Sequence, residues 1–280
     1  MGTDGLHQDE FLRGDHPNTL FHGSIATASL EAAVINAKYV NSNPLDRISR
    51  DFKANGLNLS KQTISNWTVW SAERYFQPVY DLMKKSQLEA HVNQCDETPL
   101  EVIHDGRPAG SKSYMWVHLT GELSPVPKII VYEYQKTRHS DHPKEYYKGF
   151  HGVLMTDGLE QYHKLAREQE GIINANCGAY AVCPAHCKTP FCQCHQGNGQ
   201  RESGSSQILG CLQGAGTDRA LRNFTIGRKN SMTINTICGA QASAAIYSIT
   251  ETAHVNNLNV YYYIKHLLTE LPQLVDKKEI

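Results

Sequence analysis

The chain has 280 residues, a length that one large domain or two small ones can fill around a sizeable core. Its 27 Lys and Arg nearly balance its 28 Asp and Glu, which excludes a global basic excess but not local basic patches. No apolar run is long enough to cross a membrane, and the N-terminus "MGTDGLHQDEFLRGDHP" has no apolar signal core. A soluble, cytoplasmic protein without a membrane partner is therefore expected.

The first third of the chain is predicted to be a tail followed by helices. Residues 1–23 are polar and His-rich and show no period, so a loose N-terminal tail is expected there. Apolar residues then recur with a helical period, beginning with "TASLEAAVINAKYV" and continuing to about residue 88. Residues 24–90 are therefore predicted to form a helical region.

Two helices of this region are separated by a short Gly-containing turn. In "NPLDRISRDFKANG" Asn43 is the expected N-cap of the first helix. Ser60 is the expected cap of the second helix, which turns either Trp70 or Ser71 inward. Residues 44–70 therefore match a helix-turn-helix, although the pattern alone suits a plain helical hairpin nearly as well.

Four polar side chains near the start of the second helix could reach phosphates or base edges. The predicted DNA contacts of this helix are Lys61, Gln62, Ser65 and Asn66.

After Ala90 the hydrophobic period changes from that of a helix to that of a strand. Turn-rich segments separate the strand-like runs, and two helical runs follow. The predicted order is strands at 91–103, 113–120 and 128–137, a helix at 142–150, a strand at 152–158, a helix at 159–169 and a strand at 171–177. This order predicts a mixed α/β sheet within a domain that covers residues 91–280.

Two carboxylates stand on these strands, where acids are uncommon. Asp96 interrupts "HVNQCDETPLEVI", which Thr98 and Pro99 are expected to bend, and Asp157 ends the apolar run "GVLMT". Two acids brought together at strand ends repel each other unless a cation lies between them, and Mg²⁺ suits carboxylate oxygens. Strand-end caps or turn formers are the alternative interpretation of both residues.

Longer stretches resemble a known family. "CDETPLEV", "GRPAGSKSYMWVHLTGE", "VYEYQKTR", "TDGLEQYHKL" and "GLNLSKQTISNW" are similar to the insertion-sequence sixty-six family of DDE transposases, as are "RALRNFTIGRKN" and "GAQASAAIYSITETA". The resemblance covers roughly residues 23–176 and 217–275. It implies an RNase H-like core that cleaves and joins DNA strands with two Mg²⁺ or Mn²⁺ ions. Asp96 and Asp157 are then the first two catalytic, metal-binding acids, while Glu97 is expected to serve structure.

The third acid departs from the family pattern. Asp218 stands where the family has Glu, and Glu251 is the second candidate, although its helical pattern places it on a helix surface. The resemblance also makes Arg222, Arg228 and Lys229 candidate phosphate contacts.

Residues 177–216 lack the family's text altogether. This segment holds six of the eight cysteines and many glycines, and it has no helical period. Translation out of frame is the favoured explanation, and a zinc site is the alternative, although the Cys spacings are not those of paired zinc knuckles. The chain also starts about twenty residues before "GSIA" without the family's Cys-rich segment, so a copy truncated in front is expected.

The sequence thus predicts a transposase that binds element ends and target DNA, and the alternative is an inactive remnant that only binds DNA. The resemblance further implies a homo-oligomer on DNA and, in some elements, accessory proteins.

Overall fold

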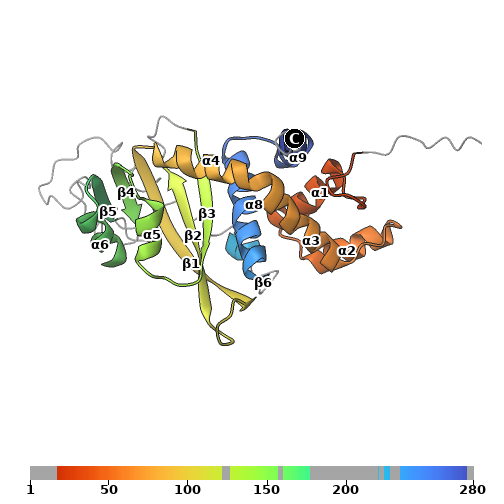
Figure 1. The fold of residues 1–280 in the computed structure, drawn as a ribbon, viewed down its shortest axis with the longest axis horizontal. Helices are drawn as coiled ribbons and strands as arrows, with labels where there is room; N and C mark the ends of the chain where they lie inside the picture. Colours follow the sequence, from red (N-terminus) through yellow and green to blue (C-terminus); the bar gives the residue numbers. More distant parts are fainter. Residues whose placement is uncertain are drawn as a thin grey trace, which may run out of the picture.

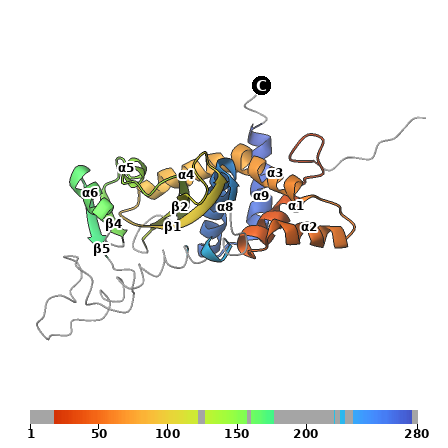
Figure 2. The same cartoon turned by 90° about the horizontal axis from the view of Figure 1, so that it is seen from below.

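The computed structural model describes residues 18–121, 127–156, 160–176, 220, 224–227 and 234–275. Seen from the side, the molecule is elongated, with a β-sheet at one end and a group of helices at the other (Figure 1). Helix α8 lies between these two parts in both views, and α4 runs from the helices along the sheet (Figure 2). No helix within the described ranges is both long and apolar enough to span a membrane.

The helical region follows the predicted pattern and consists of six segments. They are α1 (Ala28–Ile35), the π-helical η1 (Asn36–Val40), α2 (Leu45–Ala54), α3 (Lys61–Ser71), the π-helical η2 (Ala72–Phe76) and α4 (Gln77–Leu88). The packed chain begins earlier than expected. Leu20 is buried and its carbonyl accepts a hydrogen bond from the Tyr75 hydroxyl at 2.7 Å, so the predicted loose tail is wrong for the residues just before Gly23.

Of the two predicted N-caps, the structure confirms that of α3 and corrects that of α2. The Ser60 hydroxyl accepts a hydrogen bond from the Thr63 backbone N–H at 3.0 Å, which confirms Ser60 as the N-cap of α3. Helix α2 is preceded by Pro44 at the N-cap position, without a side-chain hydrogen bond, so the predicted Asn43 cap is wrong. The next turn ends at Gly56, whose φ of 83° lies in the left-handed region that favours glycine.

Helix α3 buries one face against α1 and α2. Ile64 and Trp67 are buried in a cluster with Val34 of α1 and Ile48 of α2. Further along, Ser71 is fully buried whereas Trp70 is 47% exposed, so Ser71 is the inward residue of the two that the sequence left open.

The sheet has the strand order β3-β2-β1-β4-β5, and β6 pairs with the far end of β1. The strands are β1 (Val92–His104), β2 (Lys112–Thr120), β3 (Ile130–Gln135), β4 (Gly152–Thr156), β5 (Ile172–Asn176) and β6 (Ile234–Thr236). β1, β2 and β3 pair antiparallel, while β4 is parallel to β1 and to β5. This arrangement confirms the predicted mixed α/β sheet. β1 continues through Pro99, which pairs with Tyr114, so the residues expected to bend the strand do not end it.

Strand alternation divides the side chains of the sheet between two hydrophobic clusters. Leu100, Val117 and Tyr132 belong to the cluster that includes helix α8 (Ile237–Val255) and helix α9 (Val260–Val275). Cys95 and Trp116 belong to the opposite cluster, which includes helix α5 (Asp141–Tyr146) and helix α6 (Glu160–Glu168). The face with α8 is called the α8 face below, and the other face is called the α6 face.

Helix α8 closes the free edge of β3, the outermost strand of the sheet. The Ser248 hydroxyl accepts from the Tyr132 backbone N–H at 2.8 Å. One turn later the Thr252 hydroxyl accepts from the Ile130 N–H at 2.9 Å and donates to the Ile130 carbonyl at 3.1 Å. These side chains replace a neighbouring strand, so the edge is not left open to another chain.

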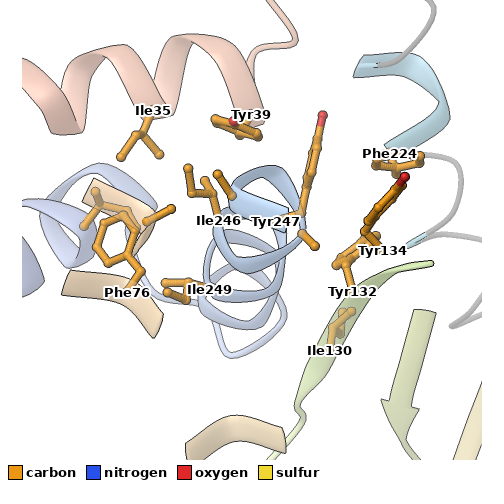
Figure 3. Packing of buried hydrophobic residues seen from close by; sticks show 14 of the residues in the cluster. Ile35, Tyr39, Phe76, Ile130, Tyr132, Tyr134, Phe224, Ile246, Tyr247 and Ile249 are labelled. Atoms are coloured by element: carbon orange, nitrogen blue, oxygen red, sulfur yellow. The ribbon is translucent and has the colours of Figure 1, made fainter. Parts of the chain in front are cut away.

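The helical region and the sheet share one hydrophobic cluster. Ile35 and Tyr39 face Ile246 and Tyr247 of α8, while Tyr132 of β3 lies on the other side of the same helix (Figure 3). The rings of Tyr39 and Tyr247 meet edge to face with their centroids 4.9 Å apart. Helix α8 is therefore buried on several sides.

Candidate active site

Asp96 occupies the middle of β1 and is half-buried. It pairs with Val117 of β2, and it shares its side of β1 with Leu100 and Val102, so its carboxylate belongs to the α8 face. Its Oδ1 accepts a hydrogen bond from the Glu97 backbone N–H at 2.7 Å. Carboxylate oxygens such as those of Asp96 are the ligands that a hard cation prefers.

Glu97 points to the opposite face of the same strand. Its buried carboxylate contacts the guanidinium of Arg138, which donates to Oε1 at 2.5 Å, and the hydroxyl of Tyr162, which donates to Oε2 at 2.5 Å. Arg138 lies between β3 and α5, and Tyr162 lies on α6. The expectation that Glu97 serves structure agrees with these contacts.

The thiol beside these acids has no reactive character. Cys95 is buried on the α6 face, and its Sγ lies 3.5 Å from the Tyr162 hydroxyl. Burial raises the pKa of the Cys95 thiol well above its ordinary value, and the negative charges of Glu97 and Asp96 add to this effect. The thiol therefore stays protonated and acts as a small apolar group.

Several predicted site residues lie outside the described ranges. They are Asp157, Asp218, Arg222, Arg228 and Lys229, together with the whole of residues 177–216. Their catalytic, metal-binding and DNA-binding roles stay predictions.

Glu251 is not the helix-surface acid that the sequence predicted. It is only 8% exposed, and it lies among α8 residues whose apolar members, Ile249 and Ala253, are buried as expected. Its charge raises the pKa of the Tyr132 and Tyr247 hydroxyls, although burial is the larger cause of both shifts. Glu251 therefore lies near β3, two strands away from Asp96 in the sheet order.

Glu251 also lines a cavity of about 440 Å³ between η1, α8 and α9. Tyr39, Ser42 and His254 are among the other lining residues. Glu251 is therefore part of the packing between η1, α8 and α9.

Within the described part of the chain, no three or more His, Cys, Asp or Glu side chains gather closely enough to hold a metal ion. Three acids are the preferred metal ligands predicted from the sequence. Of these, Asp96 is described by the structure, and Asp157 and Asp218 lie outside the described ranges. The donors named by the sequence are all carboxylate oxygens, the ligand type that suits Mg²⁺ and Mn²⁺.

The four predicted DNA-contacting side chains of the helical region lie on α3. Lys61 and Gln62 are exposed, and Ser65 and Asn66 are half-buried. The Gln62 side-chain amide donates to Asn66 Oδ1 at 2.9 Å, so these two residues present one joined polar surface. The helix thus offers hydrogen-bonding groups at its N-terminal end while its apolar face packs inward.

Sequence reasoning missed two residues next to the site, Arg138 and Tyr162. Both lie inside stretches that resemble the family, "VYEYQKTR" and "TDGLEQYHKL". Their partner Glu97 is a buried acid, and a buried acid requires a cation or hydroxyl partner. The sequence therefore indicates that Glu97 has a cation or hydroxyl partner, but which residue this is depends on long-range packing.

Comparisons with known proteins agree with the quoted stretches. The family model described as "Transposase IS66 family" matches residues 23–212. The uncharacterized protein y4jD of Sinorhizobium fredii (strain NBRC 101917 / NGR234) is 27% identical over 184 residues, which are 64% of this chain and 35% of that protein. The uncharacterized protein y4qI of the same organism is 23% identical over 191 residues, which are 67% of this chain and 35% of that protein.

The chain therefore spans about a third of the length of the curated relatives it matches. Among solved structures, the crystal structure of the Mos1 strand transfer complex gives a TM-score of 0.30 at 9% identity, over 96% of this chain and 80% of that chain. A pre-cleavage Mos1 transpososome gives a TM-score of 0.29 at 10% identity, with the same coverage. The family match extends over more than half of the chain, and the chain belongs to the IS66 family of transposases.

Proposed function

We propose that this chain carries the catalytic core of a DNA transposase, which cleaves and joins DNA strands in a metal-dependent reaction. The observation that carries the proposal is the position of Asp96. It is a half-buried carboxylate in the middle of the central strand of an RNase H-like sheet, and its orientation is fixed by the neighbouring backbone N–H. An acid at such a position needs a counter-charge, because strands solvate carboxylates poorly.

Asp157 is the proposed partner of Asp96. The described parallel ladder between β1 and β4 ends with the pair Gln94 and Met155, and each acid lies two positions beyond its strand's member of this pair. A continuation of this register would set the two carboxylates opposite each other. Their mutual repulsion would then favour a bound cation between them.

Asp218 is the first candidate for the third ligand, and Glu251 is the second, because Glu251 is buried near β3. Two Mg²⁺ or Mn²⁺ ions held by these acids would activate the attacking oxygen and stabilise the leaving oxygen of a phosphodiester. The protein's own contribution is to orient the carboxylates and to hold the DNA backbone in line with them.

DNA is the proposed partner, both as element ends and as target. Lys61, Gln62, Ser65 and Asn66 on α3 are proposed to contact the ends, and Arg222, Arg228 and Lys229 are proposed to bind phosphates near the acids. Joining two ends requires more than one copy of the chain on the DNA, so a homo-oligomer is proposed there, with accessory proteins of the same element as further partners.

Strand cleavage and joining on labelled DNA from the element's ends test the proposal. The protein is incubated with Mg²⁺ or Mn²⁺, alongside the Asp96→Asn and Asp157→Asn variants. Glu101→Gln is the matched control, because Glu101 is an exposed acid on the same strand. We expect metal-dependent products from wild type and Glu101→Gln, and at least a 100-fold loss in both Asp variants.

Folded protein that retards end DNA on a gel but yields no product with either metal would refute the catalytic proposal. That outcome would favour the inactive, DNA-binding remnant.

A further inference from the structure

Glu97, Arg138 and Tyr162 form a three-residue contact, called the Glu97 clamp below, that ties together separate parts of the sheet domain. Glu97 belongs to β1, Arg138 to the connection between β3 and α5, and Tyr162 to α6. Each oxygen of the Glu97 carboxylate has its own partner, since Oε1 accepts from Arg138 and Oε2 accepts from Tyr162. The carboxylate is fully buried, while the Arg138 side chain is 43% exposed.

Burying a charged contact of this kind costs free energy, so a role other than stability is the better explanation for it. Taking the Glu97 charge out of water costs several kcal/mol before its attraction to Arg138 offsets that cost, and well-packed apolar residues often give equal or better stability. Cys95 and Trp116, which surround the clamp, show that the same face accommodates apolar packing. Overall stability is therefore a weak reason for placing an acid at position 97.

The position of the clamp relative to the proposed acids suggests that purpose. Glu97 directly follows Asp96, and its backbone N–H donates the 2.7 Å hydrogen bond to the Asp96 carboxylate. Because neighbouring side chains of a strand point to opposite faces, the clamp holds Glu97 on the α6 face while Asp96 lies on the α8 face. Tyr162 follows Asp157 by five positions along the chain and lies in the first turn of α6.

We infer that the Glu97 clamp is a positioning device, which fixes the Asp96 carboxylate relative to the start of α6 and so sets the spacing of the metal-binding acids. This inference rests on the proposed function. Metal-assisted chemistry requires ligands held within about 0.5 Å of the productive geometry, and a displacement of about 1 Å can lower a rate about 100-fold. Glu97, Arg138 and Tyr162 are positioning residues, since they act through Asp96.

The test compares Tyr162→Phe with a matched variant, Tyr146→Phe. Both tyrosines are buried in the same hydrophobic cluster, and both hydroxyls donate to a side-chain carbonyl or carboxylate oxygen. The Tyr146 hydroxyl donates to Gln87 rather than to Glu97, so its loss leaves the clamp intact. Thermal unfolding of the two variants measures the general cost of losing a buried hydroxyl.

We expect similar melting temperatures for the two variants, but different effects on the site. Tyr162→Phe should lower the metal-dependent cleavage rate at least tenfold, raise the Mn²⁺ concentration for half-maximal rate, and leave the affinity for end DNA unchanged. Tyr146→Phe should change each of these less than twofold. Glu97→Gln, which keeps the shape of the side chain but loses its charge, should behave like Tyr162→Phe.

Hydrogen exchange of the metal-free protein separates this inference from the proposed function. Tyr162→Phe should speed amide exchange in β1 around Asp96 and in α6, and Tyr146→Phe should not. If wild type does not cleave DNA, the proposed function fails, while the exchange data still report whether the clamp holds β1 to α6. Equal exchange and equal cleavage in the two Tyr variants would overturn the inference.

Discussion

Glu31 provides the sharpest stability prediction, because it is an acid with no exposed surface at all. It lies on α1, next to Thr68 of α3. The Thr68 hydroxyl is close enough to lower the pKa of Glu31 slightly. Even so, neither carboxylate oxygen forms a hydrogen bond of normal geometry with a described residue. Burial is the dominant effect and raises the pKa of Glu31 from 4.5 to about 8.

The sign and size of the effect follow from this pKa difference. The folded protein holds a proton on Glu31 between pH 4.5 and about pH 8, whereas the unfolded chain has released it. Glu31 therefore favours the folded state fully below pH 4.5, and this contribution is lost as the pH rises towards 8. At about 1.4 kcal/mol per pKa unit, the loss between pH 5 and pH 8 is on the order of 3 kcal/mol.

Glu31→Gln removes the titration while keeping the shape of the side chain. The free energy of unfolding, measured by urea denaturation, should therefore rise in the variant relative to wild type by roughly 3 kcal/mol between pH 5 and pH 8. Half-buried Lys38, whose pKa is lowered to about 8 by burial, titrates in the same range but is present in both proteins. Glu73→Gln, at an exposed acid of η2, is the control.

The pH dependence is the decisive observable, because burying the Gln amide adds an offset that does not vary with pH. A difference between Glu31→Gln and wild type that stays constant from pH 5 to pH 8 would refute the reasoning. So would a change of the same size in the Glu73→Gln control.

Four further substitutions test the packing. Trp67→Ala should lower the free energy of unfolding, measured by urea denaturation, by about 3–5 kcal/mol, because Trp67 is buried. Trp70→Ala should lower it by less than about 1 kcal/mol, because Trp70 is exposed. Equal losses would contradict the assigned buried face of α3. Thr252→Val should lower the free energy of unfolding by about 1–3 kcal/mol, since it leaves the N–H and carbonyl of Ile130 at the β3 edge without their side-chain partner. An unchanged midpoint of urea denaturation would contradict this edge contact. Gly152→Ala should lower the melting temperature, because an added Cβ would lie 2.4 Å from the His91 carbonyl oxygen, and full stability would exclude that close approach.

Local signals were sufficient to predict most elements of this fold. The Ser60 cap and the Gly56 turn mark the boundary between α2 and α3, and period-two alternation marks β1, β2 and β3. The order of the elements predicted the mixed sheet, and the resemblance to the family implied its RNase H-like type. Neither the pairing of β6 with the end of β1 nor the contact of α8 with the β3 edge has a local signal, because both join residues more than one hundred positions apart.

In the candidate site, too, features with a local sequence pattern were predictable and features set by long-range packing were not. Alternation along β1 separates Asp96 from Glu97, and the two side chains do lie on opposite faces. Glu251 was misjudged because a polar residue in an amphipathic helix normally marks the solvent face. Helix α8 is covered by β3 on one side and by α1 and η1 on another, so the rule for surface helices does not hold for it.

A metal-specificity switch at Asp96 tests the central claim most directly. Mg²⁺ requires oxygen ligands, whereas a thiolate accepts transition-metal ions more readily. Asp96→Cys should therefore fail to cleave end DNA with Mg²⁺ and regain cleavage with Mn²⁺, while Asp96→Ala should remain inactive with both ions. Cleavage by Asp96→Ala with Mg²⁺ at the wild-type rate would contradict the assignment of Asp96 as a metal ligand, and with it the proposed catalytic core.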